Sequence, residues 1–190
     1  MSKHGETVDL ELGADGRPRV MISTYNCDFL GDEGIYYAVA GAPTGPFALD
    51  AVPATSAGGD RVADMELDRS DQPHAIFWRF TDAEDENHYL VGADTGWTST
   101  ILDAPSMNVA TMAVAPGNAV DLLAQGGSGT WYLTNRTGSF GSKQITDAFS
   151  VWSNAADVVV DLTGRPHLLF AVGDYDATRP GLFYAIGPSQ

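Results

Sequence analysis

Cysteine is almost absent from this sequence, since Cys27 is the single one among 190 residues. One thiol excludes an internal disulfide framework and a cysteine-rich zinc site. The four histidines form neither a His-x-His nor a His-Glu-x-x-His pattern, which argues against zinc held by imidazoles. We therefore expect no cofactor, with Ca²⁺ on carboxylate oxygens as the one ion to consider.

Basic residues and long apolar runs are also scarce. Ten Lys and Arg stand against 25 Asp and Glu, which gives a formal charge of −15. A protein with this net negative charge repels phosphate backbones, so nucleic acid and anionic membranes are not expected as partners. No run approaches transmembrane length, and the segment 1–6 has no apolar signal region, which predicts a cytoplasmic protein.

Helical periodicity is missing as well, and a repeat takes its place. A four-residue turn recurs about every 50 residues, the length of a four-stranded propeller blade. It reads Gly16-Arg17-Pro18-Arg19, Asp71-Gln72-Pro73-His74 and Gly164-Arg165-Pro166-His167, with a degenerate third copy, Gly117-Asn118-Ala119-Val120. Glycine tolerates positive φ, and proline gives up an N–H at a strand entrance, where the loss costs least.

Short Val-, Ile- and aromatic-rich strands surround each turn, which indicates an all-β protein. The units span about 7–53, 61–103, 109–146 and 156–187, and the fourth lacks a fourth strand. We predict a single β-propeller domain of four blade repeats. It is either a closed four-bladed propeller or half of a larger one completed by a second chain, that is, a homodimer.

A family resemblance appears in the fourth unit. The segment Val160–Phe170, Val-Asp-Leu-Thr-Gly-Arg-Pro-His-Leu-Leu-Phe, is followed by Gly-Leu-Phe-Tyr-Ala at 181–185. It resembles the repeat of bacterial β-propellers grouped with the BNR, or sialidase-like, repeats. The sialidase Asp-box is absent, because Gly126–Trp131 lacks its aspartate, and no arginine triad can be assigned. The resemblance implies a blade and no particular activity.

Acidic residues gather at two places. The loops between second and third strands at 28–33, 82–87 and 174–179 are acidic, and in a propeller such loops share the usual ligand-binding face. The repeat also places Asp9, Asp64 and Asp157 equivalently at the start of the innermost strand, with Ala110 in the third unit. Glu11 and Glu66 follow on the same strand face.

Two interpretations of these aspartates stay open. Carboxylates that face one another around the axis would form a cation or amine site. Alternatively, each Asp accepts hydrogen bonds from local N–H groups and recurs because the blade recurs.

Other candidates have weaker support. Arg79 ends a second strand and is able to reach the ligand face and pair with an acidic loop, although an ordinary surface ion pair is the preferred explanation. Trp152 lies in a loop and is the best candidate for stacking on a ligand, and Tyr175 belongs to an acidic loop. Asp121 aligns with apolar residues, so it is either turned outward by a local slip or kept for function. The recurrence of His74 and His167 after the turn favours a structural role.

Three functions are consistent with these features of the sequence. The first is a non-catalytic, lectin-like module that binds a small molecule or glycan on the acidic-loop face near the axis. The second is an enzyme of small-molecule metabolism (a lyase, cyclase or hydrolase) with axial carboxylates as acid and base. The third is a protein-interaction scaffold.

Overall fold

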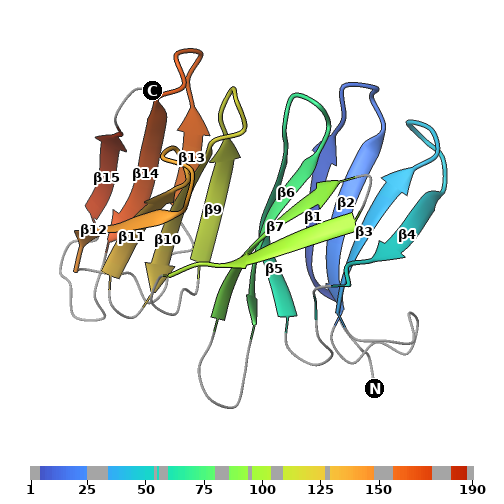
Figure 1. The fold of residues 1–190 in the computed structure, drawn as a ribbon, viewed down its shortest axis with the longest axis horizontal. Helices are drawn as coiled ribbons and strands as arrows, with labels where there is room; N and C mark the ends of the chain where they lie inside the picture. Colours follow the sequence, from blue (N-terminus) through green and yellow to red (C-terminus); the bar gives the residue numbers. More distant parts are fainter. Residues whose placement is uncertain are drawn as a thin grey trace. The chain divides into compact units, whose positions relative to one another are not determined.

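Every regular element that the structure describes is a β-strand, which confirms the all-β prediction (Figure 1). The computed structural model describes residues 5–24, 34–53, 55, 60–79, 86–93, 96–103, 109–126, 129–147, 156–172 and 181–187. Within them the strands form four antiparallel sheets, each a meander in chain order. No helix in this part of the chain is long and apolar enough to cross a membrane.

The sheets follow the predicted repeats. The first contains β1 (Gly5–Leu12), β2 (Pro18–Thr24), β3 (Gly34–Ala40) and β4 (Phe47–Ala51). The second contains β5 (Asp60–Leu67), β6 (Pro73–Arg79), β7 (Glu86–Ala93) and β8 (Gly96–Ile101). The third contains β9 (Val109–Val114), β10 (Val120–Gly126), β11 (Gly129–Thr134) and β12 (Gly141–Thr146). Among the described residues the fourth contains three strands, as predicted: β13 (Ala156–Val160), β14 (Pro166–Val172) and β15 (Gly181–Ile186).

The sheets belong to two compact units. Residues 1–101 make the first unit, with the first and second sheets, and residues 102–190 make the second unit, with the third and fourth. In each unit the inner strands of the two sheets contact one another, β1 with β5 and β9 with β13.

A five-residue turn with the same hydrogen bonds joins the first two strands of every sheet. In the second sheet the Asp68 N–H donates to the Gln72 carbonyl, and the Asp71 N–H donates to the Asp68 carbonyl, both at 3.0 Å. The fourth turn residue adopts left-handed φ in all sheets: Gly16 at 73°, Asp71 at 63°, Asn118 at 64° and Gly164 at 78°.

The third repeat therefore differs from the sequence alignment by one residue. Val120, not Ala119, stands opposite the end of the preceding strand, as Pro18 does in the first sheet. The repeat in the sequence was aligned on Gly117 as the turn glycine. In the structure Asn118 adopts the left-handed conformation of this turn position, which Asn does more readily than most residues. Thr111, not Ala110, is thus the equivalent of Asp9.

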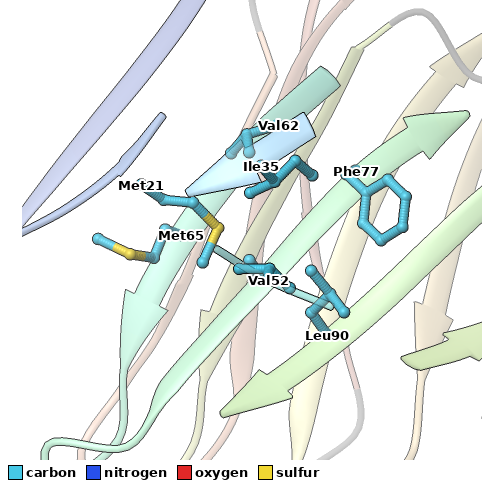
Figure 2. Close-up of a cluster of buried hydrophobic side chains, with 8 residues drawn as sticks. Met21, Ile35, Val52, Val62, Met65, Phe77 and Leu90 are labelled. Atoms are coloured by element: carbon cyan, nitrogen blue, oxygen red, sulfur yellow. The ribbon is translucent and has the colours of Figure 1, made fainter. Parts of the chain in front are cut away.

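Each sheet has one face marked by a tyrosine on its third strand: Tyr37, Tyr89, Tyr132 and Tyr184. We call this the tyrosine face and the other the reverse face. In the first unit, the tyrosine face of the first sheet packs on the reverse face of the second (Figure 2). Met21 and Ile35 meet Met65 and Phe77 there, all 1% exposed or less. Burying each such side chain contributes roughly 1.5–3 kcal/mol.

The second unit repeats this packing. Ala113 and Leu123 on the tyrosine face of the third sheet meet Val158, Leu168 and Phe170 on the reverse face of the fourth. The tyrosine face of one sheet therefore covers the reverse face of the next in both units.

The strand pattern of the sequence predicts that Phe77, Leu122, Val160, Leu169 and Tyr184 are largely buried, and part of that prediction is wrong. Phe77 and Leu122 are buried as expected, but Leu169 is 41% and Tyr184 60% exposed. Both lie on the tyrosine face of the fourth sheet, where no further sheet follows among the described residues. Leu162, expected at the end of a strand, lies in the turn and is 98% exposed, since β13 ends at Val160.

Candidate functional site

Two of the predicted inner-strand aspartates come together in the first unit. The Met65 N–H donates to Asp9 Oδ2 at 2.7 Å and to Asp64 Oδ1 at 3.0 Å. Asp9 Oδ1 also accepts from the N–H of Leu10 at 2.8 Å. The two carboxylates thus approach each other, as the axial interpretation requires, and they also accept local N–H groups, as the structural interpretation requires.

Glu11 and Glu66 lie two residues beyond these aspartates on the same strand faces. Burial, with a smaller contribution from Asp9, raises the pKa of Glu11. Asp157 is exposed and pairs with Leu169 across β13 and β14. It belongs to the second unit, so its convergence with Asp9 and Asp64 stays a prediction. Trp152 and Tyr175 lie outside the described residues.

Arg79 forms a two-point ion pair that the sequence did not predict. Its Nε and Nη2 lie 2.9 and 3.0 Å from the two carboxylate oxygens of Asp60, which stands opposite it at the start of β5. The Asp60 side chain has no exposure and that of Arg79 has 20%, so this is not the ordinary surface pair considered above. Two parallel charge-assisted bonds fix the guanidinium in one orientation.

A histidine extends this arrangement along the same end of the second sheet. His88 Nε2 lies 2.9 Å from Glu86 Oε2, and His88 Nδ1 lies 3.0 Å from Ser99 Oγ. Glu86 stands opposite Arg79 in the β6–β7 ladder. We call Asp60, Arg79, Glu86, His88 and Ser99 the strand-end cluster.

The ring of Phe77 supports the cluster from within the core. The His88 ring stacks on it, with centroids 4.7 Å apart and planes 14° from parallel. The Arg79 guanidinium lies 5.6 Å from the Phe77 centroid, within the range of a cation–π contact. The cluster is thus held on a rigid strand end, and the Glu86 side chain, 39% exposed, reaches solvent.

The fold does not require these residue types. The strand pairing places Glu86 where the other sheets have glycine: Gly34, Gly129 and Gly181. It places His88 where they have Tyr36, Trp131 and Phe183. The second sheet therefore departs from its own repeat at the strand end. Aligning the third strands of the four units would have revealed this signal in the sequence.

The tyrosine faces carry a second polar pattern, which is structural. In each sheet the second residue of the second strand reaches the repeated tyrosine. His74 Nδ1 bonds the Tyr89 hydroxyl, and His167 Nδ1 bonds that of Tyr184. In the first sheet Arg19 hydrogen-bonds Tyr37. Burial lowers the pKa of His74 and raises that of Tyr89, so the pair stays neutral at pH 7.

Asp121 completes this pattern, which corrects the suggestion that a slip turns it outward. Its side chain is fully buried and accepts from the Tyr132 hydroxyl and from both Nε and Nη2 of Arg136. The one-residue shift in the third repeat aligns it with His74 and His167. Burial, together with the bond to Asp121, raises the pKa of Tyr132 to about 12.

Metal ligation has no evident place in the described ranges, which contain no group of three or more His, Cys, Asp or Glu side chains arranged around one point. The strand-end cluster is therefore suited to hydrogen bonding through the partly exposed carboxylate of Glu86, which lies between His88 and Arg79.

No protein-family model matches the sequence, and no curated protein does either. The solved structures of similar fold include the following two. One is a protein of unknown function from Dyadobacter fermentans, with TM-score 0.65 and 12% identity over 95% of this chain and 59% of that one. The other is an endo-arabinase from Bacteroides thetaiotaomicron, with TM-score 0.53 and 15% identity over 96% of this chain and 74% of that one.

The fold is that of a β-propeller. Four antiparallel meanders packed face on face in pairs, together with the likeness to the endo-arabinase, make each sheet one blade. The chain spans about three fifths of the length of the Dyadobacter protein. The sialidase-like repeat group stays an expectation, since no family model supports it.

Proposed function

We propose that this propeller binds a neutral carbohydrate, without catalysis, at the strand-end cluster of the second blade. The observation that carries the proposal is the departure of Glu86 and His88 from the repeat at a strand end where Asp60 already orients Arg79. A partly exposed carboxylate in place of a repeated glycine is not needed for blade packing, and His88, which stacks on Phe77, also bonds that carboxylate.

The residue types suit hydroxyl groups. The Glu86 carboxylate is 39% exposed and accepts hydrogen bonds from sugar hydroxyls, and His88, whose two ring nitrogens bond Glu86 and Ser99, orients that carboxylate. The net charge of −15 disfavours anionic sugars, so the proposed ligand class is neutral sugars. Arg79 ends β6 and Glu86 begins β7, the two strands that the predicted ligand-face loop joins in the sequence. The similar endo-arabinase makes arabinose-containing oligosaccharides the first ligands to try.

The test is a glycan array followed by isothermal titration calorimetry of each hit. Glu86→Gln removes the carboxylate charge, and His88→Phe installs the ring that the fourth blade has at this position. Losing one charge-assisted hydrogen bond is worth about 1.5–3 kcal/mol, so we expect at least about tenfold weaker binding. Asp50→Asn, which removes an exposed carboxylate from β4, is the matched control and should leave affinity unchanged.

A second function is favoured by a separate observation. Asp9 and Asp64 share the Met65 N–H, and the raised pKa of Glu11 keeps a proton available at higher pH, as a general acid requires. These groups fit a hydrolase that acts at the inner strands. Release of reducing sugar from an arabinose polymer, abolished by Glu11→Gln, would support it. If Asp64→Asn abolishes binding and Glu86→Gln leaves it unchanged, the ligand binds at the inner strands and not at the strand-end cluster.

A further inference from the structure

The strand-end cluster contains a serine hydroxyl that a histidine connects to a carboxylate. Ser99 lies on β8, the outer strand of the second sheet, and is exposed. Its Oγ lies 3.0 Å from His88 Nδ1, and His88 Nε2 lies 2.9 Å from Glu86 Oε2. A hydroxyl beside a base that a third group orients is the arrangement by which proteins activate a serine nucleophile.

The direction of these hydrogen bonds suits the removal of a proton from Ser99. The Glu86 carboxylate only accepts, so in the neutral imidazole of His88 the Nε2 atom carries the hydrogen and Nδ1 accepts from the serine hydroxyl. When Nδ1 takes the serine proton, the imidazolium that forms stays beside the carboxylate, which stabilises it. The Phe77 ring stacks on the imidazole with centroids 4.7 Å apart, so the base keeps its orientation.

The third sheet provides a comparison within the same chain. Strand pairing places Ser142 of β12 at the repeat position of Ser99, and both serines are exposed. On the neighbouring strand of the third sheet, Trp131 stands in place of His88, and Gly129 stands in place of the carboxylate. Ser142 therefore has the strand position of Ser99 without an imidazole from the third strand beside it.

We propose that Ser99 is a covalent modification site, whose hydroxyl takes the acyl group of an uncharged carboxylic ester. The Ser99 oxygen bonds to the acyl carbon while the bond from that carbon to the leaving alcohol oxygen breaks. The serine proton passes to His88 Nδ1 and from there to the leaving oxygen, so the step needs no further reactant. The neighbouring Glu86 carboxylate disfavours anionic esters.

The acyl group stays on Ser99, because the base is shielded from water. The His88 side chain is only 6% exposed, and its Nε2 faces Glu86. Water that hydrolyses the ester has to reach Nδ1, and the acylated Ser99 side chain lies against that atom. The modification therefore consumes one acyl donor per chain and is not turnover. It goes beyond the proposed carbohydrate binding and does not depend on it.

Incubation with p-nitrophenyl acetate, with no sugar present, tests this modification. All samples carry Cys27→Ser, so that the single thiol does not compete. Release of p-nitrophenolate should reach one equivalent per chain and stop, and peptide mass spectrometry should locate the acetyl group on Ser99 and not on Ser142. Because both serines belong to one chain, this comparison does not depend on how a variant folds. Ser99→Ala should abolish the release, whereas Ser142→Ala, the matched control, should leave it unchanged.

His88→Phe tests the role of the base. The change keeps an aromatic ring beside Phe77, as the fourth sheet has Phe183 at this position, and an unchanged circular dichroism spectrum verifies the fold. It should slow the acetylation of Ser99 by about 100-fold or more, since a general base contributes about 10²–10⁴-fold. Equal acetylation of Ser99 and Ser142, or an unchanged rate in His88→Phe, would overturn the proposal. Release that continues past one equivalent would also overturn it, since the acyl group would not stay on the serine.

Discussion

The ion pair between Arg136 and Asp121 is buried, and we predict that it is essential for the stability of the third sheet. Arg136 neutralises Asp121, whose side chain has no exposure, while the Arg136 side chain itself is only 10% exposed. The change Arg136→Met removes the guanidinium and keeps the aliphatic stem. Asp121 would then retain the Tyr132 hydroxyl as its remaining partner from this group.

The expected cost follows from that burial. Removing one partner of a buried ion pair leaves an uncompensated charge in the interior and costs about 3–5 kcal/mol. Replacing both partners by apolar residues removes the stranded charge, so Asp121→Leu combined with Arg136→Met should recover most of the loss. Lys143→Met, which removes an exposed cation from β12 of the same sheet, should change the free energy of unfolding by less than about 0.5 kcal/mol.

Urea unfolding followed by tryptophan fluorescence measures these differences, with Trp131 on β11 next to Tyr132 as the probe in this sheet. The chain has two compact units, so each transition is fitted separately. A loss below about 1 kcal/mol for Arg136→Met, or a double variant no more stable than the single one, would show that Asp121 is solvated and would refute the buried-pair argument.

Three further predictions concern stability. Burial holds the pKa of His74 below 6.5, so the unfolded chain binds more protons as pH falls below 6.5; urea midpoints should therefore decrease in that window, and decrease less in His74→Gln. Phe77→Ala should lower the free energy of unfolding by about 3–5 kcal/mol, because Phe77 is buried. Leu169→Ala, at a residue that is 41% exposed, should lower it by less than about 1.5 kcal/mol, and equal losses for the two variants would contradict this difference in burial. Asp71→Gly and Asn118→Gly relieve the same left-handed backbone, but only Asp71 binds Arg19 and the Ala14 N–H, so it alone should lose about 1–3 kcal/mol by thermal unfolding.

The local structure was readable from the sequence because strands and turns are encoded in consecutive residues. Alternation of apolar side chains and Gly-x-Pro turns located the strands, including the three described strands of the last blade. The equivalence of Asp9 and Asp64 also followed from counting, and the structure brings the two together at the Met65 N–H. The third repeat was misaligned by one residue because Gly117 was taken as the left-handed turn residue, a position that Asn118 occupies.

The strand-end cluster could not be predicted from the sequence, for a different reason. Asp60 and Arg79 lie on neighbouring strands and meet only through their register, and His88 reaches Ser99 across another strand pair. The exposure of Leu169 depends on whether another sheet covers the face it lies on, which its own sequence neighbourhood does not encode. The sequence by itself determined the blades, their turns and the carboxylates of the inner strands, because each arises from periodicity within a few residues. Only the tertiary structure decided which charges pair, which histidine joins a cluster and which apolar faces stay open, because those depend on contacts between strands far apart in the chain.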